Sequence, residues 1–127
     1  LLSWMQKNKA DYTNTFLFLM EEKISKDELF QDSAFLDWDQ QWQERLKQNK
    51  KPVGLSLNLM KKNNPLIIPR NHKVEEALEA ASINGDLQPM FDLHEVLKNP
   101  YNNQPEISAY QNIPEPNEQV YKTFCGT

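Results

Sequence analysis

The sequence is poor in cysteine and glycine, and it has no long apolar run. Its one cysteine, Cys125, cannot form a disulfide within the chain, which together with the absence of Asn-x-Ser/Thr sites favours a reducing, cytoplasmic setting. The longest apolar run, residues 16–20, is far shorter than the roughly 20 residues that span a bilayer, so we expect no membrane partner. The chain starts at Leu1 without a basic and apolar leader, so we expect a portion of a longer protein rather than a signal peptide.

The scarcity of glycine and histidine also limits the chemistry. A nucleotide-phosphate loop needs clustered glycines, but the three glycines of this chain are far apart in sequence. The candidate zinc ligands His72, His94 and Cys125 lack the spacing of known zinc motifs. A magnesium site needs as few as one or two carboxylates, so the sequence leaves it open. We expect His94 to be a partly buried packing residue beside an apolar stripe.

Charge is abundant but unevenly distributed. The net charge is −4, yet residues 44–73 carry eight Lys and Arg side chains against one carboxylate, a local charge of +7 between two acidic ends. From this basic segment we select four residues as candidates for docking or for facing a phosphate: Arg45, Lys61, Lys62 and Arg70. The alternative, that the segment is a solvated face paired with acidic neighbours, is favoured by the general behaviour of charge runs. Nucleic acid is excluded as a partner because the second helix of an apparent helix-turn-helix, from Asp86 onward, is acidic.

Apolar residues recur at helical spacing, which predicts an all-α fold, a small irregular helical bundle. We expect helices around residues 12–20, 33–46, 71–84 and 87–98, with Asn71 and Asp86 as N-caps and Gly85 as a helix stop. Residues 53–60 fit a strand or a helix, and helix is favoured because no partner strand is evident. Residues 25–28 have the form of a capping box.

Beyond Pro100 the sequence changes character. Residues 101–127 contain several prolines and amides with no sustained period, which predicts an extended Pro-rich tail without regular structure. We therefore divide the chain into a helical domain, residues 1–100, and a tail, residues 101–127, that carries Cys125 near its end. An exposed thiol there is a candidate redox group.

Two tryptophans, Trp38 and Trp42, lie four residues apart, with Arg45 nearby. This spacing places both indoles on one helical face, where they either pack in the core or stack on a ligand. Core packing is the favoured interpretation, because apolar residues at helical spacing usually face a core.

Taken together, several short blocks resemble the C-terminal part of the selenoprotein O family, also called YdiU. The resemblance covers essentially the whole chain and depends on the order and spacing of the blocks. They are Asp11-Tyr12-Thr13-Asn14-Thr15-Phe16, Trp38 and Trp42 with Arg45, Met60 with Asn64-Pro65 and Arg70-Asn71, Glu76-Ala77 with Gly85-Asp86, and Pro100-Tyr101 with Gln104-Pro105. Cys125, third from the end, stands where family members have selenocysteine or cysteine, although Gly126-Thr127 follows it where serines are common.

The resemblance implies a kinase-like enzyme that transfers AMP from ATP to hydroxyl side chains of proteins, with magnesium or manganese. It also implies that the nucleotide-binding and metal-binding residues lie upstream, so that no catalytic, cofactor or metal residue falls on this chain and the chain alone is inactive. We expect the upstream kinase-like domain to be its partner, with residues 45–73 facing that domain or its nucleotide cleft. The alternative is a non-enzymatic helical module that binds another protein.

Overall fold

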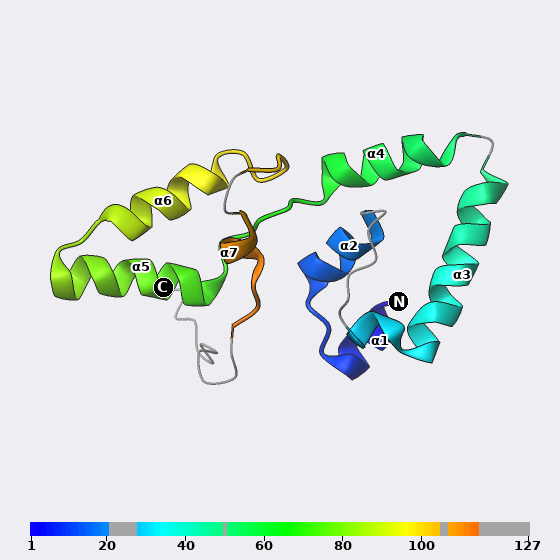
Figure 1. The fold of residues 1–127 in the computed structure, drawn as a ribbon, viewed down its shortest axis with the longest axis horizontal. Helices are drawn as coiled ribbons and strands as arrows, with labels where there is room; N and C mark the ends of the chain where they lie inside the picture. The colour runs from blue at the N-terminus through cyan, green and yellow to red at the C-terminus, as the bar shows by residue number, and fades with distance from the viewer. Residues whose placement is uncertain (21–27, 50, 105–106, 115–127) are drawn as a thin grey trace, which may run out of the picture. The chain divides into compact units, whose positions relative to one another are not determined.

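The computed structural model describes residues 1–20, 28–49, 51–104 and 107–114. Within these residues all regular structure is helical, as the sequence predicts. The chain divides into two compact units, Leu1–Pro65 and Leu66–Thr127, here called the N-terminal and the C-terminal unit. Figure 1 shows the helices of each unit.

The described residues of the N-terminal unit form four α-helices and one 3₁₀ helix. Its elements are α1 (Leu2–Asn8), α2 (Tyr12–Met20), η1 (Glu28–Gln31), α3 (Ser33–Gln48) and α4 (Val53–Asn63). The helices predicted around residues 12–20 and 33–46 are confirmed, and the ambiguous stretch after Pro52 is helix rather than strand. Helix α1 was not predicted, because seven residues carry too little periodicity for a pattern. Most of the expected capping box, residues 25–28, lies outside the described residues.

An aromatic cluster forms the core of this unit. Trp4, Phe30 and Phe35 are buried, and the ring centroids of Trp4 and Phe35 lie 4.7 Å apart. Phe18 stacks on Phe30 at 4.1 Å. Aromatic pairs at these distances add to the free energy gained by burying the rings. The cluster therefore joins α1, α2, η1 and α3 through side chains that are far apart in sequence.

A buried polar contact fixes the start of α3 against this core. The side chain of Asp32, the N-cap of α3, accepts a hydrogen bond from the backbone N–H of Phe35 at 3.2 Å. The same oxygen, Oδ2, accepts a second hydrogen bond from the indole Nε1–H of Trp4 at 2.7 Å. One carboxylate thus caps a helix and satisfies the polar atom of a buried tryptophan.

The C-terminal unit is built on a helical hairpin. Its elements are α5 (Asn71–Asn84), α6 (Gln88–Leu97) and the short α7 (Ile107–Gln111). Gly85 ends α5 with a positive φ of 66°, as predicted from Asn84-Gly85. Asp86 Oδ1 accepts a hydrogen bond from the backbone N–H of Gln88, but Leu87 occupies the N-cap position of α6, so the predicted N-cap Asp86 lies one residue too early. The predicted N-cap Asn71 is wrong by one residue, because Asn71 is already helical and Arg70 occupies the cap position.

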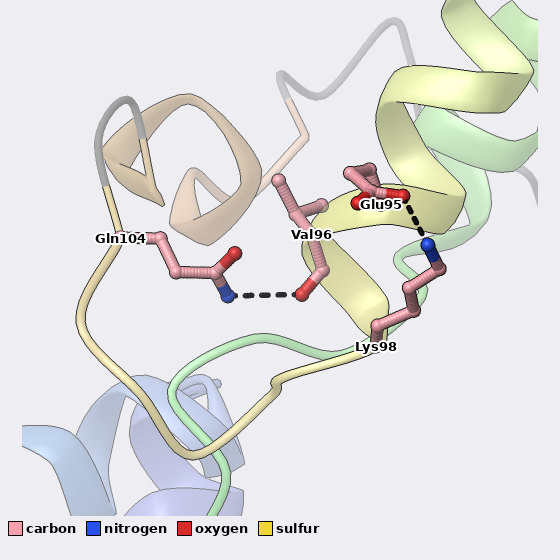
Figure 2. A network of polar contacts seen from close by, with 4 residues as sticks. All are labelled: Glu95, Val96, Lys98 and Gln104. Carbon is pink, nitrogen blue, oxygen red and sulfur yellow. Dashed lines mark hydrogen bonds and ion pairs between the residues drawn. The ribbon is translucent and has the colours of Figure 1, made fainter.

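The chain after α6 is held against the hairpin by hydrogen bonds. The carbonyl oxygen of Pro100 accepts from the backbone N–H of Leu66 at 2.7 Å, and Gln104 Nε2–H donates to the carbonyl of Val96 at 3.0 Å (Figure 2). Gln111, at the end of α7, donates from Nε2 to the carbonyl of Leu66 at 3.0 Å. Helix α7 corrects the expectation that residues 101–127 lack regular structure throughout, since five residues in the middle of that segment are helical.

Candidate functional site

The four predicted docking residues are divided between the two units. Arg45 on α3 is exposed and donates to Asn49 Oδ1 at 2.7 Å, and Lys61 and Lys62 are exposed near the end of α4. Arg70 belongs to the C-terminal unit and is 8% exposed. The basic segment therefore contributes to two separate units, and Arg70 differs from the other three in being buried. Whether any of the four faces a docking surface or a phosphate stays a prediction.

The C-terminal unit has a cavity between its three helices. It has a volume of about 240 Å³ and is lined by residues of α5, α6 and α7, namely Lys73, Glu76, Pro89, Asp92, Leu93, Ala109 and Tyr110. Lys73 Nζ lies 2.6 Å from Glu76 Oε2, and Asp92 Oδ1 accepts from Gln88 Nε2–H at 2.7 Å. Two carboxylates against one ammonium, which is already paired, disfavour a phosphate here.

Sequence reasoning did not find this cavity. Its residues come from three segments whose convergence depends on the bonds that position α7, above all the bond from Gln111 to Leu66. The helical period of α5 and α6 predicts the hairpin, but it does not predict that α7 packs beside the hairpin and completes the lining of the cavity.

Among the residues that the structure describes, the carboxyl group of a salt bridge at the end of α6 is the one whose pKa is clearly shifted. Lys98 donates a hydrogen bond to Glu95 Oε2 (Figure 2). This hydrogen bond, together with the charge of Lys98, lowers the pKa of the Glu95 carboxyl, and His94 contributes in the same direction. Both side chains are largely exposed, so the pair stabilises the helix end only weakly.

The tryptophan pair belongs to the core. Trp38 and Trp42 stack with ring centroids 6.0 Å apart and an interplanar angle of 10°, and both are half-buried against the aromatic cluster. The predicted core packing is confirmed. Arg45 on the same helix bonds to Asn49, a residue one turn further along.

Of the three candidate metal ligands, the structure describes His72 and His94. Among the described residues, the structure has no group of three or more His, Cys, Asp or Glu side chains arranged to hold a metal ion. His94 is exposed, so the expectation of a partly buried packing residue is wrong; Leu93, the preceding residue, takes the buried position on α6. His72 is half-buried, and Cys125 lies outside the described residues.

The described residues show no glycine-rich loop before the start of a helix, of the kind that holds the phosphates of a nucleotide. The cavity of the C-terminal unit is lined by two carboxylates, which makes it unsuited to phosphate. No helix in the described part of the chain is both long enough and apolar enough to cross a membrane.

Comparison with known proteins identifies the family. Residues 1–98 match the family described as protein adenylyltransferase SelO. The chain belongs to this family. It is 46% identical over all 127 residues to the protein nucleotidyltransferase YdiU of Nitrosococcus oceani and of Alcanivorax borkumensis, and 47% identical to that of Bacillus cytotoxicus. The predicted resemblance to the selenoprotein O (YdiU) family is thus confirmed.

The same comparisons show how much of such a protein is present. The chain spans 26% of the length of each of these relatives, while the relatives align with 100% of the chain. The SelO-family chain described here therefore corresponds to about a quarter of the proteins it matches.

Proposed function

We propose that the chain is the helical C-terminal region of a kinase-like protein adenylyltransferase, which transfers AMP from ATP to hydroxyl side chains of other proteins. The observation that carries the proposal is the identity of 46–47% along the whole chain to nucleotidyltransferases that are about four times as long. Identity at this level over every helix supports a shared fold and a shared place in a larger protein.

In this proposal ATP and the magnesium or manganese ion bind to the upstream part of the protein. The role of the chain is then structural: it packs against the upstream kinase-like domain. The protein substrates of the full-length enzyme contact regions that this chain does not supply.

The experiment compares the full-length protein with the chain alone. Both are incubated with ATP labelled on the α-phosphate, Mg²⁺ or Mn²⁺, and a mixture of protein substrates, and transfer of labelled AMP is followed on a denaturing gel. We expect label on protein only with the full-length protein. Transfer by the chain alone would contradict the upstream position of the site, and no transfer by the full-length protein under any metal condition would contradict the proposed activity.

The alternative, a helical module that binds other proteins without catalysis, is supported by a different observation. Both units leave large apolar side chains exposed, among them Leu59, Ile83 and Phe91. Loss of AMP transfer on removal of residues 1–127 from the full-length protein would favour the enzyme. Unchanged transfer without them would favour a separate binding module.

A further inference from the structure

Helix α4 combines an apolar sequence with little burial. All eleven of its residues are described and none is buried. One side of the helix carries half-buried residues, including Val53 and Leu57, and Met60 on that side packs against the aromatic cluster. On the other side Leu55 is 55% exposed and Leu59 is 64% exposed.

The exposed residues form a continuous face. Leu55 and Leu59 are four residues apart and Lys62 follows three residues later, so all three lie on one side of the helix. We call this surface the Leu55–Leu59–Lys62 face. Lys61 is equally exposed but lies two residues after Leu59, which places it on a different side.

A helix of this kind depends on what it packs against. Isolated helices shorter than roughly 12 residues are marginal in water, and most helical stability in proteins comes from packing of an amphipathic face. Helix α4 packs one face within the N-terminal unit, through α2 and α3, and its second apolar face is uncovered. The two exposed leucines lie one turn apart and so place apolar surface side by side, and contiguous exposed apolar surface is what marks interaction sites.

We propose that the Leu55–Leu59–Lys62 face docks on the part of the same polypeptide that lies outside residues 1–127, on an apolar surface that places a carboxylate opposite Lys62. The proposal rests on the proposed function. The relatives have about three-quarters of their length outside the matched region, which supplies a large surface in the same molecule. A second copy of the chain is a poorer occupant, because in a two-fold interface the same patch meets itself and would bring two Lys62 side chains together.

The first test is a site-specific cross-link in the full-length protein. Leu59 is replaced by the photo-reactive residue p-benzoylphenylalanine, and the matched control carries the same residue at Lys61. Unlabelled and ¹⁵N-labelled proteins are mixed before irradiation, and cross-linked peptides are identified by mass spectrometry. We expect position 59 to cross-link at least about tenfold more than position 61, to peptides outside residues 1–127 of the same molecule. Cross-links between labelled and unlabelled copies, predominant cross-links to other residues within 1–127, or equal yields at the two positions would overturn the proposal.

The second test uses charge and the same full-length protein. Lys62→Glu is compared with Lys61→Glu, which makes the same change of charge one residue earlier. We expect Lys62→Glu to speed amide hydrogen exchange across α4 about tenfold, since like charges opposed at an interface are strongly unfavourable, while Lys61→Glu leaves it within about twofold of the unaltered protein. Equal effects of the two variants would contradict the assigned face.

These tests separate the docking surface from the enzymatic proposal. AMP transfer is measured on the unaltered full-length protein. If transfer occurs but positions 59 and 61 behave alike, the docking face is wrong and the function stands. If position 59 cross-links as expected and no AMP is transferred, the docking face stands and the function is wrong.

Discussion

The double role of Asp32 leads to a quantitative prediction. The change is Asp32→Ala, which removes the N-cap of α3 and the acceptor of the Trp4 indole N–H together. Loss of an N-cap costs about 1 kcal/mol, and leaving the buried indole donor without a partner costs about 1–3 kcal/mol. Trp4 is only 8% exposed, so water compensates little. We therefore expect the free energy of unfolding to fall by about 2–4 kcal/mol.

The assay is denaturant unfolding followed by tryptophan fluorescence. All three tryptophans lie in the N-terminal unit, so the signal reports on that unit alone. Asp32→Asn is the matched control, because its amide oxygen can still accept both hydrogen bonds, and we expect a loss of only about 1 kcal/mol. Asp32→Ser keeps the cap with a side chain too short for the indole, and should fall between the two.

A double-mutant cycle separates the two contributions. Trp4→Phe removes the indole donor, so in that background Asp32→Ala should cost only the cap, about 1 kcal/mol. The coupling between the two positions is then about 1–3 kcal/mol, the cost of leaving the indole donor without a partner. The reasoning is refuted if Asp32→Ala costs less than about 0.5 kcal/mol, the level of an ordinary surface substitution, or if the two substitutions add without coupling.

Three further predictions concern single residues. Gly85→Ala should lower the free energy of unfolding by about 1 kcal/mol, because φ at Gly85 is 66° and alanine is strained there. Gly54→Ala should raise the free energy of unfolding by about 0.5–1 kcal/mol, because Gly54 is helical and an added Cβ meets nothing within 4 Å. The midpoint of thermal unfolding should therefore fall in the first variant and rise in the second. Phe35→Ala should cost about 3–5 kcal/mol by denaturant unfolding, as the ring is 1% exposed among other aromatics, and a loss under 1 kcal/mol would contradict the assigned core. Lys98→Met should raise the pKa of Glu95 toward its ordinary value, as measured by a carboxyl NMR titration. Because the pKa of Glu95 is lowered in the folded state, the stabilisation by the Glu95–Lys98 pair is fully present above the ordinary pKa of the carboxyl. It is lost as the pH falls through the pKa of the folded state.

Local features of the fold were predictable because the signals are local. Gly85 takes the αL conformation because few other residue types adopt a positive φ without strain, and the short side chain of Asp86 reaches the backbone N–H of Gln88 two residues later. The helical period of α3 predicts a buried Phe35 and the packing of Trp38 and Trp42. Each of these inferences needs information from within about one turn of the chain.

Features that depend on distant partners were not predictable in the same way. The indole of Trp4 meets Asp32 across 28 residues, and Gln111 meets the carbonyl of Leu66 across 45. The error at His94 has a related cause. Packing against α5 selects Leu93 for burial and leaves His94 and the larger Phe91 exposed, although all three lie within one turn of α6.

The cations of the basic segment are close together in the sequence but are divided between the two units of the fold. The basic segment is continuous in sequence, but the boundary after Pro65 assigns its last cations, Arg70 among them, to the C-terminal unit. Within α4, the neighbours Lys61 and Lys62 point to different sides because consecutive helical residues diverge by about 100°. Of these two lysines only Lys62 lies beside Leu55 and Leu59, so on α4 positive charge coincides with exposed apolar surface at Lys62. The proposed docking surface combines apolar side chains with a charge on the same side of the helix. Its position therefore depends on which side of α4 each residue occupies rather than on the net charge of the basic segment.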